Sequence, residues 1–351
     1  MKMKANYNVI VPRLDNTGPT NVALDLAKIA LSKGYNVKLF YLSGSITRTD
    51  LGQFNSINKL QIFTLSKVKG IVHTHGLRPD LLGALLSFKK NCITVSTLHG
   101  QYPHHISQDY SQWKLFLGWA AWSTALTKIK YVVCISQTMQ RYYKRFLPKM
   151  KTEVVYNFRS LSDACTKHNS DSFSRWLQLQ RQYSRFVVLY VGSITIRKDI
   201  VNFLKQFEKI NDVSFAVCGN GNLTEEMLRL KSFATEKNFY LGQVNDPTTI
   251  MSQCDALVLP SKAEGFPLVV LESYFTHKPV LLSNIAVHRE LSNLGLGFIF
   301  NKHSQKDFIM KLIDALKSQG NTLENHGLSQ KLSPANGFAE YEKIFLNVGG
   351  Q

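Results

Sequence analysis

Residues 255–284 read DALVLPSKAEGFPLVVLESYFTHKPVLLSN, with two acidic residues between two strongly apolar segments. The segments DALVLP and KPVLLSN are short apolar runs bounded by turn residues, which is the pattern of strands buried in a parallel sheet. A helix is predicted to begin near Pro267, because proline suits the first turn of a helix. Glu264 then lies at the carboxyl end of the first strand, and Glu272 lies between one and two turns into the helix.

The loop and first helical turn between these acids are a candidate anion-binding site. The first N–H groups of a helix have no partner within the helix and favour negative charge. Two carboxylates that flank such a site suit a nucleotide sugar, which has a diphosphate in its middle and hydroxyl groups at both ends. A capping acid followed by a surface-facing Glu gives the same spacing, so spacing alone leaves both interpretations open. The residues of the predicted anion site are Gly265, Phe266, Pro267, Leu268 and Val269.

The rest of the chain repeats this alternation of apolar strands and amphipathic helices, which is typical of parallel-sheet α/β domains. Polar residues 160–184 interrupt the alternation. We therefore expect two doubly wound, Rossmann-like domains, residues 1–165 and 184–330, and a C-terminal helix at 331–351 that packs back on the first domain. Ligands of such domains bind at the carboxyl ends of the strands, and the two domains are expected to face one cleft.

Charge is distributed unevenly along the chain. Residues 1–160 contain 22 Lys and Arg but only 6 Asp and Glu, whereas residues 161–351 contain 20 and 18. A basic half of this kind concentrates anionic partners such as nucleic acid, acidic lipid or a phosphorylated ligand, although a merely solubilising charge is the alternative. Residues 112–151 mix aromatic and cationic residues, a composition that suits a membrane interface or a core with a solvated rim.

Other features narrow the protein class. The five cysteines are scattered without a C-x-x-C pair, which indicates reduced thiols in a cytoplasmic protein. The N-terminal sequence predicts a first strand and no signal peptide, and no run of 18 apolar residues predicts a membrane span.

Several nucleotide-binding and metal-binding patterns are missing. Neither G-x-x-x-x-G-K-[ST] nor a strand followed by G-x-G-x-x-G occurs, which disfavours a P-loop nucleotidase and a standard dinucleotide-binding dehydrogenase. Gly219 and Gly221 in GNGN are a weak signal that more often marks a tight turn. His73 and His75 point to one face of a strand, but without a nearby acidic or Cys partner we expect no metal site there.

The chain resembles the retaining glycosyltransferases of family 4, which have the GT-B fold. The resemblance rests mainly on EGFPLVVLE, in which seven residues separate the two acids, and on the following strand. Weaker matches occur in family order through most of the chain, at DNTGPTN, TLHG, VVCIS, VVYN, VLYVGSITIRKD, FAVCGNG and YLGQV.

The resemblance implies roles for particular residues. Glu264 matches the acid that contacts the donor sugar and supports charge near the anomeric carbon, and Glu272 matches the acid that accepts hydrogen bonds from the ribose. Lys198 matches the lysine that neutralises the diphosphate, and Gly18 matches the N-terminal glycine loop. His99 matches a histidine near the transferred sugar, although a lone histidine is as readily structural. The glycines expected to line the donor site are Gly192, Gly219 and Gly221.

The sequence departs from the family pattern at two loops. The family commonly has Arg directly after the glycine at 192, whereas this chain has Ser193, and Arg197 is the candidate replacement. The N-terminal loop has one glycine, followed by Pro19, where two glycines are common. These changes affect the expected phosphate geometry more than the class of chemistry.

The resemblance implies a hexosyltransferase that uses a nucleotide-sugar donor, UDP-linked in our prediction, and neither a metal nor another cofactor. We expect a lipid-linked glycan acceptor in bacterial surface polysaccharide synthesis (lipopolysaccharide, O-antigen or capsule), peripheral association with the anionic inner face of the cytoplasmic membrane, and no nucleic-acid partner. The alternatives are a non-catalytic nucleotide-sugar-binding protein of the same fold and a nucleic-acid-binding protein. No residue identifies the donor sugar, the acceptor linkage or the oligomeric state.

Overall fold

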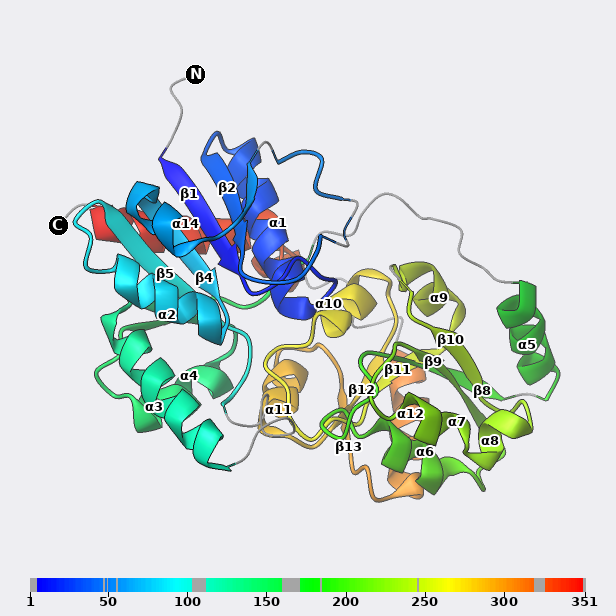
Figure 1. The fold of residues 1–351 in the computed structure, drawn as a ribbon. Helices are drawn as coiled ribbons and strands as arrows, with labels where there is room; N and C mark the ends of the chain where they lie inside the picture. The colour runs from blue at the N-terminus through cyan, green and yellow to red at the C-terminus, as the bar shows by residue number, and fades with distance from the viewer. Residues whose placement is uncertain are drawn as a thin grey trace. The chain divides into compact units, whose positions relative to one another are not determined.

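The computed structural model describes residues 5–46, 48, 50–54, 56–102, 112–159, 171–183, 185–244, 246–318 and 326–349. The chain forms two compact units, each built around its own parallel sheet (Figure 1). Unit 1 contains Met1–Ser160 and Ser329–Gln351, and unit 2 contains Leu161–Leu328. The predicted α/β architecture of two Rossmann-like, parallel-sheet domains is confirmed.

The sheet of unit 1 has the strand order β3-β2-β1-β4-β5-β6-β7, and neighbouring strands are parallel. Its central strands are almost wholly buried, as expected for a parallel sheet that is covered on both faces. The strands are β1 (Asn6–Val11), β2 (Asn36–Tyr41), β3 (Ile57–Lys59), β4 (Gly70–His75), β5 (Cys92–Leu98), β6 (Tyr131–Cys134) and β7 (Thr152–Val154).

Helices cover both faces of this sheet. On one face, the Thr74 hydroxyl of β4 donates to Asp80 of α2 at 2.6 Å, and the Trp122 indole of α3 donates to the same carboxylate. On the other face, His73 packs against Tyr341 of α14, which lies next to α1 although it follows it by some 300 residues (Figure 1). The helices are α1 (Gly18–Ser32), the 3-10 helix η1 (Ile62–Lys67), α2 (Leu77–Leu86), α3 (Gln112–Lys128), α4 (Gln137–Phe146) and α14 (Pro334–Gly349).

The sheet of unit 2 has the strand order β10-β9-β8-β11-β12-β13, also parallel. Its strands are β8 (Phe186–Val191), β9 (Val213–Cys218), β10 (Phe239–Gly242), β11 (Ala256–Leu259), β12 (Val280–Ser283) and β13 (Phe298–Phe300). The helices of unit 2, in chain order, are α5 (Asp171–Gln182), α6 (Ile200–Phe207), α7 (Thr224–Leu228), α8 (Lys231–Ala234), α9 (Thr248–Gln253), α10 (Leu268–Phe275), α11 (Ala286–Asn293) and α12 (Gln305–Lys317). The short helix α13 (His326–Lys331) contains the boundary between the units.

The boundary between the units differs from the predicted one. The sequence predicts a first domain that ends at 165 and a second that begins at 184, whereas unit 2 begins at Leu161 and includes α5. Helix α5 is amphipathic, and its buried Phe173 and Trp176 both pack against Phe239 of β10. Most polar side chains of α5 lie on its exposed face, so the polar composition of residues 171–182 conceals a helix of unit 2.

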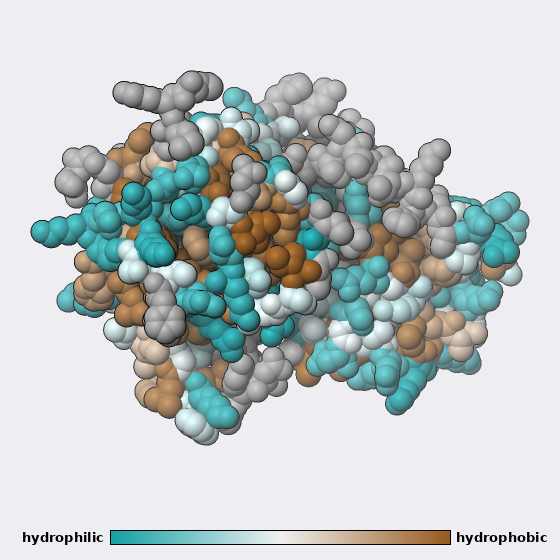
Figure 2. Space-filling model, turned by 45° about the horizontal axis from the view of Figure 1, so that its top comes forward, coloured by the Kyte–Doolittle hydropathy of each residue, from teal (hydrophilic) through white to brown (hydrophobic). Residues whose placement is uncertain are grey.

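Several aromatic residues are exposed on the surface. In the part of the chain that the structure describes, no helix is long and apolar enough to cross a bilayer. Hydrophobic groups form separate patches between hydrophilic ones on the face shown in Figure 2. In α3, Trp113 and Phe116 are 62% and 69% exposed, whereas Trp122 is buried and donates to Asp80. Trp122 belongs to the core, because its indole N–H satisfies a buried carboxylate. It is not available to a membrane, as the sequence pattern alone would allow.

The described cysteines, Cys92, Cys134, Cys218 and Cys254, are buried and free, and Cys165 lies outside the described residues.

Candidate active site

Glu264 lies where the sequence predicts it, in the loop between β11 and α10 at the carboxyl end of a strand. Its side chain is only 5% exposed and accepts three hydrogen bonds. The donors are Lys198 Nζ at 2.6 Å, Arg197 Nη1 at 3.2 Å and Ser261 Oγ at 2.7 Å. The carboxylate therefore has the partners that a buried acid requires.

The cations keep this buried acid ionised. Burial by itself raises the pKa of Glu264, but the positive charges of Lys198 and Arg197 outweigh it and lower the pKa to about 2. Burial also lowers the pKa of Lys198, an effect that Arg197 reinforces and Glu264 opposes. Two cations and one carboxylate leave a net positive charge in this cluster, which suits a second anion such as a phosphate group.

Hydrogen bonds and ion pairs fix the loop that carries Arg197 and Lys198. The Lys262 backbone N–H donates to the Arg197 carbonyl at 2.8 Å, which connects this loop to the one that carries Glu264. Asp199 has a left-handed backbone (φ 58°) that is uncommon outside glycine. Its carboxylate pairs with Lys262 at 2.9 Å and with Lys302 at 2.6 Å. These contacts fix the direction from which Lys198 reaches Glu264.

Arg197, the candidate replacement for the arginine of the family, lies in the same cluster as Lys198 and Glu264. Its Nη1 donates to the Ala263 carbonyl at 2.8 Å as well as to Glu264. Ser193, which stands where the family commonly has Arg, accepts a hydrogen bond from Tyr190 through its backbone carbonyl. The guanidinium therefore enters the cluster from a different point of the loop.

The predicted anion site lies at the start of α10, which begins at Leu268 with Pro267 as its N-cap. Gly265, Phe266, Pro267 and Val269 are buried and Leu268 is half-buried. Glu272 is 9% exposed. Burial raises the pKa of the thiol of Cys218, the last residue of β9, and the nearby charge of Glu272 adds to this shift. Glu264 and Glu272 thus both lie at the carboxyl edge of the same sheet.

The glycines of the neighbouring loops are required by packing. A Cβ on Gly219 would lie 1.9 Å from the Gly192 carbonyl oxygen, and one on Gly221 would lie 2.2 Å from the Ile194 carbonyl oxygen. Gly219 also has a φ of 140°. The loops after β8 and β9 interlock through these glycines, so the tight-turn interpretation accounts for them without a ligand.

In unit 1, His75 and His99 lie together at the carboxyl ends of β4 and β5. The two rings stack, and His75 Nδ1 is 2.9 Å from His99 Nε2. His73 is hydrogen-bonded to Tyr7 and to Thr97, both at 2.7 Å. Burial lowers the pKa of His73 to about 3, and it lowers that of His75 well below the ordinary value, so both rings are neutral at pH 7. Among the described residues, no three His, Cys, Asp or Glu side chains form a metal-binding group.

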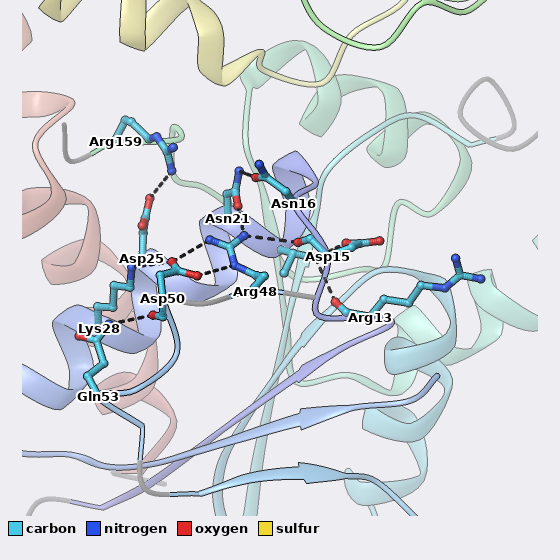
Figure 3. A network of polar contacts seen from close by, with 11 residues as sticks. Arg13, Asp15, Asn16, Asn21, Asp25, Lys28, Arg48, Asp50, Gln53 and Arg159 are labelled. Carbon is cyan, nitrogen blue, oxygen red and sulfur yellow. Dashed lines mark hydrogen bonds and ion pairs between the residues drawn. The ribbon is translucent and has the colours of Figure 1, made fainter. Parts of the chain in front are cut away.

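Gly18 begins α1, and the loop before it is held by a network of polar side chains (Figure 3). Arg48 donates to the Asp15 carbonyl, to Asn21 and to both carboxylate oxygens of Asp50. A Cβ on Gly18 would meet nothing within 4 Å, so packing does not require glycine there. The side chain of Arg13 extends away from the network (Figure 3).

Sequence reasoning missed the polar residues that support Glu264. Ser261, Asp199, Ser283 and His288 are all buried within unit 2. Ser261 could have been found, because a hydroxyl three residues before a buried acid is a natural donor to it. His288 has no comparable local signal.

Two family models match the chain and together span most of it. The model described as "Glycosyltransferase Family 4" matches residues 17–163, and the model described as "Glycosyl transferases group 1" matches residues 178–331. The class defined by this fold and site is therefore the GT-B glycosyltransferases. The chain belongs to the family-4 type of these enzymes.

Relatives and solved structures agree with this assignment. The chain is 26% identical over 299 residues to an O-antigen biosynthesis glycosyltransferase, WclY, of Escherichia coli, covering 82% of each chain. It is 27% identical over 259 residues to the UDP-Gal:alpha-D-GlcNAc-diphosphoundecaprenol alpha-1,3-galactosyltransferase of Escherichia coli, covering 69% of this chain and 65% of the relative. The crystal structure of Anabaena HepE in complex with UDP has the same fold, with a TM-score of 0.73, 17% identity, and coverage of 97% and 100%.

Proposed function

We propose that this glycosyltransferase transfers a hexose from a UDP-linked donor, with retention of anomeric configuration, to a lipid-linked glycan used in bacterial surface polysaccharide synthesis. The observation that carries the proposal is the buried cluster of Glu264, Lys198 and Arg197 at the carboxyl edge of the unit 2 sheet. The relative named as an O-antigen glycosyltransferase and the relative named for a UDP-Gal donor and a diphosphoundecaprenol acceptor support the choice of substrates.

The proposed chemistry follows from the charge of the cluster. Cleavage of a nucleotide sugar places negative charge on the departing diphosphate and positive character on the anomeric carbon. Lys198 and Arg197 hold one positive charge more than Glu264 neutralises, and the N-terminus of α10 adds N–H dipoles that favour an anion. These groups take the place of a metal ion in stabilising the leaving group. Removing one preorganised donor of this kind lowers kcat by about 10²–10³-fold.

Glu264 and Glu272 take different roles in this proposal. Glu264 is ionised and held by two cations, and in this proposal its negative charge supports the positive anomeric carbon. Glu272 accepts hydrogen bonds from the ribose and contributes to donor affinity in ground state and transition state alike. For unit 1, the proposal assigns His99 to contact with the transferred sugar and the N-terminal loop at Gly18 to contact with phosphate or acceptor; a Cβ on Gly18 would meet nothing within 4 Å.

The acceptor side of the proposal rests on the surface of unit 1. Exposed Trp113 and Phe116 lie in one helix with Lys114, and Lys144, Arg145, Lys149 and Lys151 are exposed further along the chain. Aromatic side chains at headgroup depth and cations over anionic lipid are a common means of peripheral membrane attachment. We propose that this surface docks on the inner face of the cytoplasmic membrane, where a lipid-linked acceptor is reached.

A donor panel tests the proposal. Purified protein is incubated with UDP-glucose, UDP-galactose, UDP-N-acetylglucosamine and GDP-mannose, with and without lipid-linked acceptors, and released nucleoside diphosphate is measured. We expect release from one UDP-sugar, increased by acceptor. Binding without turnover of any donor would support a non-catalytic nucleotide-sugar-binding protein instead. Retention on DNA that is stronger and more salt-dependent than on anionic vesicles would favour the nucleic-acid alternative.

A further inference from the structure

A series of buried hydrogen bonds within unit 2 connects α11 to Glu264. His288 of α11 is fully buried, and its Nδ1 lies 2.9 Å from the Ser283 carbonyl oxygen and 3.1 Å from Ser283 Oγ. Ser283 is the last residue of β12, and its Oγ donates to the Ser261 carbonyl oxygen at 2.6 Å. Ser261 Oγ donates in turn to Glu264 Oε1 at 2.7 Å.

The contacts of His288 determine its tautomer. A carbonyl oxygen only accepts hydrogen bonds, so His288 Nδ1 carries a hydrogen and donates it. Burial lowers the pKa of His288 to about 4, despite the opposing effect of Glu264, so the ring is neutral at pH 7 and Nε2 has no hydrogen. Nε2 is buried without a hydrogen-bond partner among the described residues. An unpartnered lone pair is more readily tolerated there than an unpartnered N–H group.

Each link of the chain therefore has one direction. His288 donates to Ser283, Ser283 donates to the Ser261 backbone, and Ser261 donates to Glu264. Glu264 Oε1 also accepts a hydrogen bond from Lys198 Nζ at 2.6 Å. The same carboxylate oxygen therefore contacts both Ser261 and Lys198. Ser261 is fixed through both its carbonyl and its hydroxyl, which leaves the side chain of Glu264 little freedom to turn.

We propose that His288 and Ser283 are positioning residues, which act through Ser261 to aim Glu264 at Lys198. The proposal rests on the proposed function of Glu264. Neither residue needs to touch the substrate, and the imidazole neither gains nor loses a proton during the reaction. Displacing a reactive group by about 1 Å can lower an enzymatic rate by about a hundredfold, so a supporting contact of this kind affects turnover more than donor affinity.

Two substitutions of His288 separate this role from direct contact with a ligand. The amide of His288→Asn can occupy the place of Nδ1 and donate to Ser283, whereas that of His288→Gln reaches the place of Nε2 and leaves Ser283 without its donor. We expect kcat to fall about 10- to 100-fold in His288→Gln and in Ser283→Ala, with donor KM changed less than about threefold. We expect His288→Asn to retain most of the wild-type kcat. His303→Gln, an exposed site in the same unit, is the matched control.

Two outcomes would overturn the positioning role. Rescue by His288→Gln and not by His288→Asn would mean that Nε2 contacts a ligand. A rise in donor KM at unchanged kcat would mean the same. Thermal unfolding of each variant identifies any loss of rate that comes from loss of folded protein.

A spectroscopic measurement tests the hydrogen bonds from His288 to Glu264 without any need for turnover. It therefore distinguishes an error in the positioning proposal from an error in the proposed function. In ¹⁵N-histidine-labelled protein, the His288 ring, assigned by its absence in His288→Asn, is expected to be neutral at pH 7 with hydrogen on Nδ1. A hydrogen on Nε2, or a charged ring at pH 6, would overturn the proposal. If the tautomer is as expected but the wild-type protein turns over no donor, the hydrogen bonds from His288 to Glu264 are structural only and the catalytic proposal fails.

Discussion

The carboxyl edges of the two sheets are built from different chemistry. In unit 2, Glu264 is buried among Lys198 and Arg197, and opposite charges hold the site together. In unit 1, His75 and His99 meet as an imidazole pair, and burial keeps His75 neutral. A fixed charge cluster suits a reaction step in which charge separates. A neutral imidazole pair suits the binding of hydroxyl groups, so the difference supports the proposal that unit 2 supplies the charged groups of the reaction.

The largest expected effect is that of Lys198→Met. Methionine fills similar space but removes the charge, which leaves Glu264 with one cation and the leaving diphosphate with less stabilisation. We expect kcat to fall about 10²–10³-fold, measured as release of nucleoside diphosphate. Lys205→Met, at an exposed salt bridge in the same unit, is the matched control. Turnover within about twofold of wild type would remove Lys198 from the site.

Reversing the cationic surface of unit 1 is expected to have an effect of similar size. Changing Lys144, Arg145, Lys149 and Lys151 to Glu should lower binding to anionic vesicles by about a thousandfold or more at low salt, because each of the four cations near such a surface contributes about 1 kcal/mol. Cosedimentation at low and high salt measures this. The same change at Lys209, Lys231, Lys306 and Lys317 of unit 2 is the control, since these side chains are also exposed.

Donor hydrolysis should stay nearly unchanged in the unit 1 variant, because the charge cluster lies in unit 2. If wild-type protein does not bind anionic vesicles at low salt, the membrane proposal fails and a water-soluble acceptor becomes the better hypothesis.

Substituting Glu272 is expected to have a smaller effect, on affinity. Glu272→Ala should raise donor KM about tenfold with little change in kcat, because ribose contacts exist in both ground and transition states. Glu290→Ala, on the neighbouring helix α11, serves as a comparison. An unchanged KM with a collapsed kcat would contradict the ribose assignment and place Glu272 next to the reacting carbon.

The last expected effect concerns the buried histidines of unit 1 and appears in stability, not in turnover. The pKa of His73 is lowered to about 3, so below about pH 6.5 the unfolded chain binds a proton that the folded chain does not. Stability from this group is therefore present above pH 6.5 and falls as pH decreases toward 3, by up to about 1.4 kcal/mol per pH unit. We expect His73→Asn to be less stable at pH 7 but to lose less stability on acidification.

Urea unfolding between pH 7 and pH 4 measures this difference. If the free energy of unfolding of His73→Asn changes with pH as steeply as that of wild type, His73 is not the group whose protonation changes on unfolding.

The sequence predicts the fold well where the apolar patterns are strong. The block at 255–284 gives β11, α10 and β12 in order, and the helix begins one residue after Pro267. It predicts less well where polarity conceals an amphipathic helix, as in α5, whose Phe173 and Trp176 are buried while its other face is polar. The spacing of apolar residues predicts a helix. It does not predict that the apolar face of α5 packs against β10, which lies more than 50 residues later in the sequence.

The site is predictable in its acids and cations but not in their pairing. Glu264 and Lys198 follow from the family pattern, whereas the role of Arg197 in the same cluster depends on how two distant loops meet. Ser283 and His288 escape sequence reasoning for the same reason, because their hydrogen bonds connect β12 and α11 to a loop more than 20 residues earlier. Likewise, the sequence around Trp122 suits an aromatic residue at a membrane interface, whereas in the structure its indole N–H donates to the buried Asp80.

The most direct test of the central claim, that protein cations and not a metal stabilise the leaving diphosphate, is the rate of UDP release from the preferred UDP-sugar in EDTA. The measurement compares wild-type protein in EDTA with the same protein supplied with Mg²⁺ or Mn²⁺. We expect rates in EDTA close to those with either metal, because Lys198, Arg197 and the N-terminus of α10 supply the positive charge. Full loss of activity in EDTA, restored by Mg²⁺ or Mn²⁺, would contradict this account.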